Sequence, residues 1–342
     1  MKQVTKIFAT FFLTLLLFAQ SAPFVQAKGE NKKPDPNFMD KATHVEKSNL
    51  PYYGKDAIVD IYLADGMFYS VDTITQDIVE IEPDVMSYQV DSVYDENQLQ
   101  GLAETIIADF LGDKVKLDKL SFSLNQKIGT YFFRWDDVTK KNDDGFAFIQ
   151  VGLSQNGDFL NLVNTLPFGN KFSAGSTKAL LLLNPNPSLI GPFNQIYANG
   201  GSYWTAGNGA YLLSATGGYY SLYPTGCSGT FCSKYYYSTA TSSAFISGKW
   251  TPNANTNTKA AAFIPYGSNA TATVKYEIKP IGSASIFKLI DQNAYGNTWV
   301  NITPVTVVTS GISYIKLFDV GFNGTGTSSY KVAWDEVWVY NP

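Results

Sequence analysis

Apolar and polar positions alternate with a period near two over much of the chain, a pattern that predicts short β-strands. Before residue 94 the alternation covers three runs, Ala57–Leu63, Met67–Asp72 and Asp77–Glu82. One later segment departs from it. From Asp95 or Glu96 to Leu111, apolar residues recur at spacings of three and four, which predicts an amphipathic helix that ends at Gly112.

The helix is followed by a second series of strand-like runs. These are Leu120–Leu124, Thr130–Trp135, Phe146–Leu153 and Phe159–Val163. Asn156-Gly157 lies between the last two runs and indicates a hairpin. A helix followed by antiparallel strands is an α+β unit. We therefore predict an acidic α+β domain over residues 51–167, with the helix packed on the sheet.

The second half of the chain shows a different pattern. Short aromatic and β-branched runs recur from Ala210 to Tyr340, and no useful helical period interrupts them. About ten such runs predict an all-β sandwich or jelly roll over 193–342. A stretch rich in Gly, Ser and Pro at 168–192 predicts a linker between two domains. Residues 28–50 are polar and broken by prolines, and they predict a flexible arm.

Composition and charge agree with two folded parts. Hydrophobic residues make up 45% of the chain and charged residues 16%, which excludes a disordered chain. Residues 28–170 hold 13 Lys/Arg and 24 Asp/Glu, a net charge of −11, whereas residues 171–342 hold 10 and 5, a net charge of +5. The whole chain carries only −4, so no nucleic-acid partner is expected.

The first 27 residues have the three parts of a secretory signal peptide. Lys2 and Lys6 precede an apolar run from Ile7 to Phe18, and Ala22–Ala27 offers a cleavage site. Twelve apolar residues are too few to span a bilayer, which needs about 20. The pattern predicts a protein that is secreted to the extracellular side, with no membrane partner.

Part of the first half resembles a known family. The helix, then Tyr131-Phe-Phe-Arg-Trp135, then Phe148–Gly157 is similar to a PepSY-type domain. The resemblance implies a secreted protein of a Gram-positive bacterium and a small binding module, sometimes an inhibitor or propeptide of a secreted protease. It brings no catalytic residue.

The second half resembles the golvesin C-terminal domain. The resemblance is carried in order by Trp250-Thr-Pro252, Ala262–Pro265, Ala270–Ile278, Asp291-Gln292, Trp299 and Val332–Asp335. It implies a carbohydrate-binding-like β-sandwich and does not name the sugar.

Two cysteines stand five positions apart in a Gly-rich turn. Cys227 and Cys232 are predicted to form a disulfide, because an exported protein meets an oxidising environment. A redox pair is an alternative, although such pairs usually have two intervening residues and a helix N-terminus. A zinc site is a second alternative, and it lacks two further ligands.

The sequence offers few residues that are suited to catalysis. The single histidine, His44, lies in the polar arm, and no metal-ligand spacing or phosphate-binding loop is present. We therefore predict no catalytic residue and no cofactor. Asp335, within an aromatic strand region, allows a structural calcium with Asp319. The alternative is a carboxylate that accepts backbone N–H groups.

Exposed aromatic rings are the remaining functional signal, because flat rings stack on the apolar faces of sugars. Alternation along the predicted strands selects Tyr220 and Tyr236 as ligand-binding candidates, and Trp204 is a third because it lies among Gly, Ser, Thr and Asn. The alternative is a Tyr-rich sandwich whose outer face is merely amphipathic. The hypothesis is a secreted, non-catalytic protein that binds polysaccharide or cell-wall glycan. The alternatives are a regulator of a secreted protease, acting through the PepSY-like domain, and a glycan-degrading hydrolase.

Overall fold

The computed structural model of the chain describes residues 33–53, 57–89, 94–142, 145–171, 195–197, 204–207, 217–221, 234–242, 247–252, 258–265, 267, 269–303, 311–322, 329–335 and 337–340. By its internal contacts the chain divides after Glu30, and Asn31–Pro342 forms one compact unit. The predicted signal peptide, Cys227, Cys232 and most of the 168–192 linker lie outside the described residues. The secretion, disulfide and domain-boundary predictions therefore stay predictions.

One antiparallel sheet organises the N-terminal half, residues 33–171, with the strand order β1-β2-β3-β4-β8-β7-β6-β5. The strands are β1 (Thr43–Asn49), β2 (Ile58–Ala64), β3 (Met67–Asp72), β4 (Ile78–Pro83), β5 (Ser121–Gln126), β6 (Thr130–Asn142), β7 (Gly145–Ser154) and β8 (Phe159–Asn164), and β9 (Asn170–Lys171) pairs with β6. Two four-stranded meanders, β1–β4 and β5–β8, meet where β4 pairs with β8. The predicted hairpin between β7 and β8 is confirmed, and Gly157 in its turn has φ +80°.

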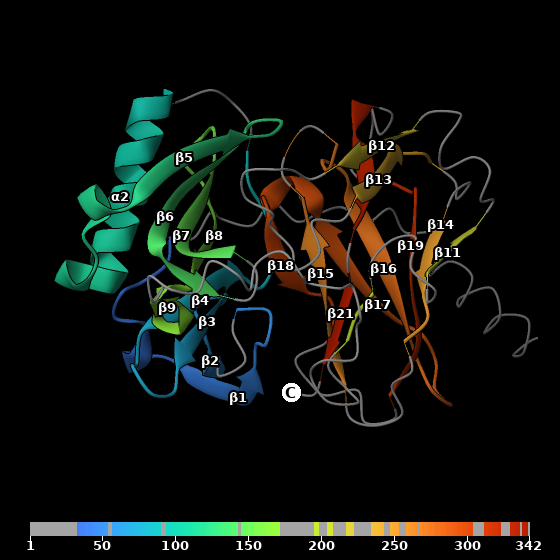
Figure 1. Cartoon of the computed structure of the whole chain (residues 1–342), viewed down its shortest axis with the longest axis horizontal. Helices are drawn as coiled ribbons and strands as arrows, with labels where there is room; N and C mark the ends of the chain where they lie inside the picture. Colours follow the sequence, from blue (N-terminus) through green and yellow to red (C-terminus); the bar gives the residue numbers. More distant parts are fainter. Residues whose placement is uncertain are drawn as a thin grey trace, which may run out of the picture. The chain divides into compact units, whose positions relative to one another are not determined.

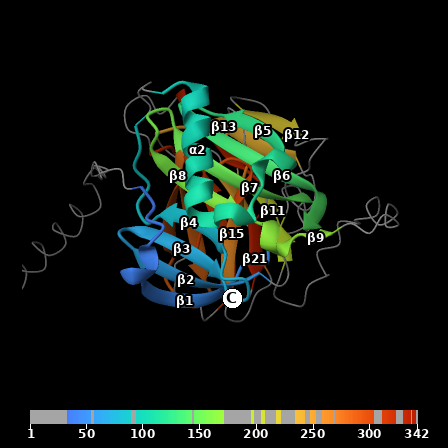
Figure 2. The same cartoon turned by 90° about the vertical axis from the view of Figure 1, so that its left-hand side faces the viewer.

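The predicted helix is confirmed as α2 (Glu96–Leu111), the one α-helix among the described residues. A capping box starts it, because Asp95 Oδ1 accepts the Gln98 N–H and Gln98 Oε1 accepts the Asp95 N–H, each at 2.9 Å. Its buried residues share a core with β3 and β7, and Figure 2 shows α2 lying against this sheet. They are Leu99, Ala103, Ile107 and Leu111.

The prediction of a flexible arm over 28–50 is wrong for its last part. Thr43–Asn49 forms β1, which pairs with β2 from Ile58 to Leu63. Its side chains are mostly polar and only Ser48 is buried, so the sequence lacks a strong apolar alternation there. Backbone hydrogen bonds to β2 form this strand instead. His44 lies in it, 3.2 Å from Asp60 and half-exposed.

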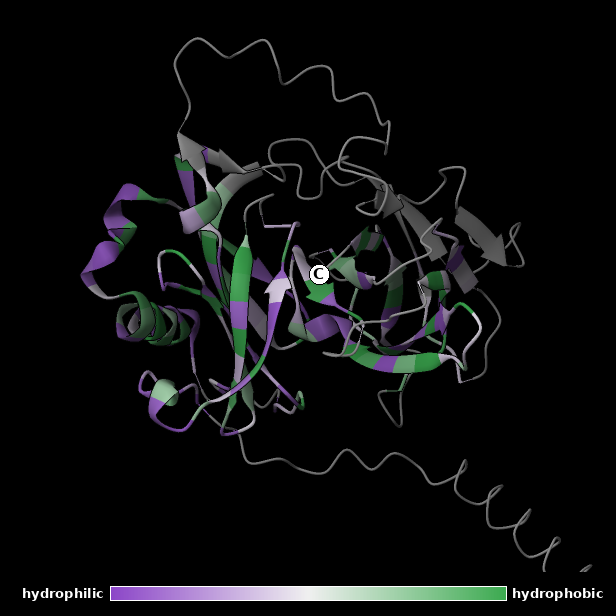
Figure 3. Cartoon of the chain, turned by 90° about the horizontal axis from the view of Figure 1, so that it is seen from below, coloured by the Kyte–Doolittle hydropathy of each residue, from purple (hydrophilic) through white to green (hydrophobic). Residues whose placement is uncertain are grey.

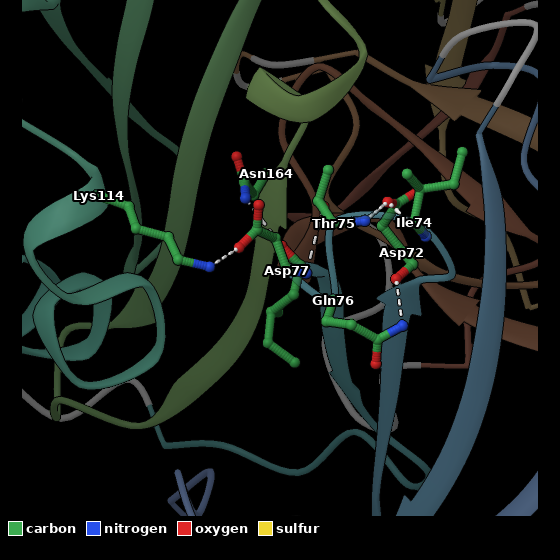
Figure 4. A network of polar contacts seen from close by, with 8 residues as sticks. Asp72, Ile74, Thr75, Gln76, Asp77, Lys114 and Asn164 are labelled. Atoms are coloured by element: carbon green, nitrogen blue, oxygen red, sulfur yellow. Dashed lines mark hydrogen bonds and ion pairs between the residues drawn. The ribbon is translucent and has the colours of Figure 1, made fainter.

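Side-chain hydrogen bonds fix the turn between β3 and β4 (Figure 4). Asp72 Oδ1 accepts the N–H groups of Ile74 at 3.0 Å and Thr75 at 2.6 Å. Lys114 donates to Asp77 Oδ1 at 2.5 Å, which connects the turn to the segment that follows α2. The short 3-10 turns of this half are η1 (Phe38–Asp40), η2 (Gly112–Lys114), η3 (Leu117–Lys119) and η4 (Leu166–Phe168).

The C-terminal half, residues 195–340, is β-rich, as predicted (Figure 1). Its described strands are β10 (Gln195–Tyr197), β11 (Trp204–Gly207), β12 (Gly217–Ser221), β13 (Lys234–Thr239), β14 (Ser247–Trp250), β15 (Lys259–Ile264), β16 (Thr273–Pro280), β17 (Ile286–Asp291), β18 (Thr298–Asn301), β19 (Ile312–Phe318), β20 (Lys331–Trp334) and β21 (Val337–Tyr340), with the turn η6 (Gln292–Ala294).

These strands form three antiparallel sheets, with the orders β10-β21-β15-β18, β11-β14-β19-β16-β17 and β12-β13-β20. The colouring in Figure 3 shows hydrophobic and hydrophilic bands alternating along strands, as expected where only one face is buried. β20 pairs with β13 and β21 pairs with β10 and β15, so the last two strands enter different sheets. The finer arrangement, two domains with a sandwich or jelly roll, stays a prediction.

A shared core connects the two halves. One cluster of buried residues contains Val59 and Leu160 from the first sheet together with the aromatic residues of β18 and β21. The Tyr52 ring lies 6.2 Å from the Trp299 ring and 5.8 Å from the Tyr340 ring. The Trp299 and Trp338 rings meet edge to face at 5.5 Å. Burial of these large rings supplies much of the apolar contact between the halves.

The segment 291–297 of the C-terminal half, called the joining segment below, is held by the first sheet through its backbone. Five consecutive carbonyls accept hydrogen bonds from side chains of the N-terminal half. The pairs are Lys127 with Gln292 (2.8 Å) and Tyr295 (2.5 Å), Thr130 with Asn293 (2.8 Å), Asn161 with Ala294 (2.7 Å) and Gln150 with Gly296 (2.8 Å). A Cβ added at Gly296 would stand 2.8 Å from the Phe132 ring, so this close approach requires glycine.

Candidate functional site

The three aromatic residues selected from the sequence lie in two different sheets. Trp204 is in β11, where it pairs with Trp250. Tyr220 is in β12, and Tyr236 is in β13, where it pairs with Trp334. Both tryptophan partners are buried. The side chains of the three candidates lie outside the described part of the structure, so their binding role stays a prediction.

The two carboxylates of the calcium interpretation are both buried. Asp319 follows β19, and its carbonyl accepts the Thr241 N–H at 2.7 Å. Asp335 follows β20, and its charge adds to the burial that raises the pKa of Tyr276 above its ordinary value. Within the ranges that the structure describes, no group of three or more His, Cys, Asp or Glu side chains could hold a metal ion. The calcium interpretation is therefore not supported by a ligand set and stays a prediction.

The outer face of the five-stranded sheet carries a group of residues that the sequence analysis did not select. Along β16 the side chains alternate, with Val274, Tyr276 and Ile278 buried and Thr273, Lys275, Glu277 and Lys279 partly exposed. On β19, Ile315 and Leu317 are buried, and Tyr314, Lys316 and Phe318 alternate with them. The pairing register places four residues side by side across β14, β19, β16 and β17: Lys249, Lys316, Glu277 and Phe287.

Lysine and aromatic side chains on this face lie against one another. Lys275 Nζ is 5.0 Å from the centre of the Phe287 ring and 5.2 Å from that of Phe322. Lys316 Nζ is 4.2 Å from the centre of the Phe318 ring. All three distances are typical of cation–π contacts. Phe287 is 56% exposed and Phe322 is 39% exposed, so these rings face solvent while they hold the ammonium group between them.

A single carboxylate orders the middle of the face. Glu277 Oε1 accepts the Tyr314 hydroxyl at 2.8 Å and the Ser285 hydroxyl at 2.7 Å. The hydrogen bond to Glu277 raises the pKa of Tyr314, which stays a neutral donor. Lys249 Nζ lies 5.1 Å from the centre of the Tyr314 ring. The tyrosine ring is thereby held between a carboxylate at its hydroxyl and an ammonium over its face.

We call this group the lysine–aromatic face. It consists of Lys249, Lys275, Glu277, Lys279, Ser285, Phe287, Tyr314, Lys316, Phe318 and Phe322. Four lysines against one glutamate give it a charge of +3. The strand lies within the aromatic and β-branched runs predicted between Ala210 and Tyr340, but the sequence signal that would have found the face is its lysines rather than its tyrosines.

A second polar cluster lies between the halves, at Glu80 and Glu82. The two share one side of β4, and they accept the hydroxyls of Tyr53 at 3.1 Å and Tyr295 at 3.4 Å, respectively. Burial raises the pKa of both carboxyls, and the nearby charge of Glu82 raises that of Glu80 further. Lys288 counteracts the shift at Glu82. The Glu82–Tyr295 hydrogen bond joins the two halves, whereas Glu80 and Tyr53 both belong to the N-terminal half.

At pH values above 7, the Glu80→Gln variant should melt at a higher temperature than wild type. A carboxyl whose pKa is raised on folding stabilises the fold below its unfolded pKa, near 4.5, and that stabilisation is lost as pH rises through the folded pKa. Glutamine keeps an acceptor for Tyr53 and carries no charge. The check is a series of melting curves from pH 4 to 9 on wild type, Glu80→Gln and the exposed control Asp118→Asn. A pH dependence that is the same in wild type and Glu80→Gln would contradict it.

Comparison with known proteins gives no family for this chain. No protein-family model matches the sequence, and no curated protein matches it. Among solved structures, a Paenibacillus xanthan lyase aligns at 12% identity and a TM-score of 0.32, over 65% of this chain and 23% of the lyase. An exo-β-1,3-galactanase from Phanerochaete chrysosporium, solved with galactose, aligns at 10% identity and a TM-score of 0.27, over 88% and 68%.

TM-scores this low do not establish a common fold, and the chain spans about a quarter of the lyase. The PepSY-type and golvesin resemblances therefore stay predictions. In the described part of the chain, no helix is both long enough and apolar enough to cross a membrane.

Proposed function

We propose that the protein is a non-catalytic polysaccharide-binding protein that holds glycan chains on the lysine–aromatic face, outside the cell as its leader sequence predicts. The observation that carries the proposal is the pair of solvent-facing rings, Phe287 and Phe322, on either side of Lys275. Large apolar side chains that gather on a surface are typical of binding sites. A sugar ring offers an apolar C–H face for stacking and hydroxyls for hydrogen bonds.

The polar groups of the face suit the hydrogen bonds that sugar hydroxyls form. The Tyr314 and Ser285 hydroxyls are oriented by Glu277, so they are fixed before a ligand arrives. Preorganised polar groups lower the entropic cost of binding. The face also has one carboxylate, whereas a glycosidase needs two about 5–9 Å apart across a cleft. Its composition therefore favours binding over hydrolysis.

Removing either exposed ring should weaken glycan retention without unfolding the protein. We expect Phe287→Ala and Phe322→Ala each to reduce affinity roughly tenfold, about 1.4 kcal/mol, because a central aromatic contact is lost. Melting temperatures should stay close to wild type, since exposed substitutions usually cost less than about 0.5 kcal/mol. The measurement is depletion from solution by insoluble chitin, cellulose, peptidoglycan and cross-linked polygalacturonate.

Phe122→Ala is the matched control, because Phe122 is 43% exposed but lies on β5 of the other half. Trp204→Ala, Tyr220→Ala and Tyr236→Ala in the same assay test the residues selected from the sequence. The proposal fails if wild type is retained on none of the polymers, or if loss of Phe287 and Phe322 changes retention no more than loss of Phe122.

A further inference from the structure

The lysines of the lysine–aromatic face differ in their ion pairing from six basic side chains of the N-terminal half. Among the described residues, Lys249, Lys275, Lys279 and Lys316 form no ion pair with a carboxylate. In the N-terminal half, six basic side chains lie within 3.7 Å of one. They are Lys41, Lys114, Lys116, Lys119, Lys140 and Arg134. The face therefore keeps its positive charge, although the whole chain carries −4.

Two of these lysines face each other directly. Lys249 of β14 pairs in register with Lys316 of β19, and like charges directly opposite on a sheet destabilise it. Lys249 lies over the Tyr314 ring and Lys316 over the Phe318 ring, and Glu277 lies opposite Lys316 on its other side. An arrangement that costs stability in the free protein becomes favourable when an anion lies between the two lysines.

We propose, on the basis of the function proposed above, that the glycan bound here is acidic and carries carboxylates on its sugar rings. A uronic-acid residue has an apolar ring face and a carboxylate on the same unit. The lysine–aromatic face offers a ring and an ammonium about 4–5 Å apart at three places, at Phe287, Tyr314 and Phe318. These pairs are spread over β14, β19, β16 and β17, which adjoin one another about 5 Å apart, and several such pairs on one face fit a polymer with repeated charges.

The test compares one polymer with and without its charge. Polygalacturonate and its fully methyl-esterified form share a backbone, and only the first is an anion. We expect the intact protein to bind polygalacturonate at least tenfold more tightly in 50 mM salt, and to lose this preference in 500 mM salt as the charges are screened. The double variant Lys275→Gln/Lys316→Gln should lose the preference, so that it binds the two polymers about equally. Lys119→Gln, an exposed lysine of the other half, is the control.

The other outcomes separate the two proposals. Equal binding of both polymers, or retention on the neutral polymers alone, overturns the acidic-ligand inference and leaves glycan binding standing. Binding to no polysaccharide overturns both. A single-stranded DNA oligomer of equal charge should compete poorly, because it lacks pyranose rings that display an apolar face. Competition as strong as that of polygalacturonate overturns the inference in favour of a general polyanion site.

Discussion

Lys127→Met should lower the stability of the whole fold by about 3 kcal/mol or more, with a fall of several degrees in melting temperature. The Lys127 ammonium donates to Ala270 at 3.0 Å, Gln292 at 2.8 Å and Tyr295 at 2.5 Å, all backbone carbonyls of the C-terminal half. Methionine fills a similar volume and donates nothing, so three buried acceptors lose their partner. Each such loss costs about 1–3 kcal/mol.

The burial of Lys127 adds to the sensitivity of this site. Burial lowers the pKa of the ammonium well below its ordinary value, and the nearby carboxylate of Asp291 opposes that shift. Three carbonyl oxygens match the three N–H groups of an ammonium, which is the arrangement that a buried charge requires.

Urea unfolding of Lys127→Met checks this prediction. Lys119→Met is the control, because the Lys119 side chain is 76% exposed. The joining segment is also held by Thr130, Gln150 and Asn161, so we expect the variant to fold and to unfold at lower urea. Equal midpoints for the two methionine variants would show that Lys127 does not hold the halves together.

Local patterns in the sequence predicted the elements whose cause is local. The helix α2 was predicted within one residue at each end, because its apolar period, its Asp95 cap and Gly112 lie within the segment itself. β1 was missed because Thr43–Asn49 has few buried side chains, and its pairing with β2 depends on residues up to 20 positions further on. A strand formed mainly by backbone hydrogen bonds leaves little trace in hydropathy.

The sites depend on contacts that no window of sequence contains. Lys127 stands in a short polar turn between β5 and β6 and would be read as exposed, yet its partners lie 143 to 168 positions away. The lysine–aromatic face contains residues from β14, β16, β17 and β19. Which of these residues are neighbours depends on the pairing register of the strands. Side-chain alternation shows that β16 has two faces, but not which faces of other strands adjoin it.

The second large effect concerns the ion pair between β15 and β1. Lys259 is a fully buried residue of the C-terminal half, and its ammonium bonds Glu46 Oε1 and lies 3.5 Å from the Ser48 hydroxyl. Burial lowers the pKa of Lys259, and the Glu46 carboxylate counteracts this. Lys259→Met leaves the Glu46 carboxylate, only 16% exposed, without its cation. Removal of one partner of a buried pair costs about 3–5 kcal/mol.

The double variant Glu46→Leu/Lys259→Met distinguishes a pair that stabilises from one that only avoids an uncompensated charge. Replacing both partners by apolar residues is often neutral, so we expect the double variant to recover most of the stability that Lys259→Met loses. Urea unfolding of wild type, Lys259→Met, Glu46→Leu and the double variant forms a double-mutant cycle. The cycle should then give an interaction free energy of several kcal/mol between the two side chains. If the two single losses simply add in the double variant, the pair contributes nothing as a pair, and β1 is held to the C-terminal half by apolar burial alone.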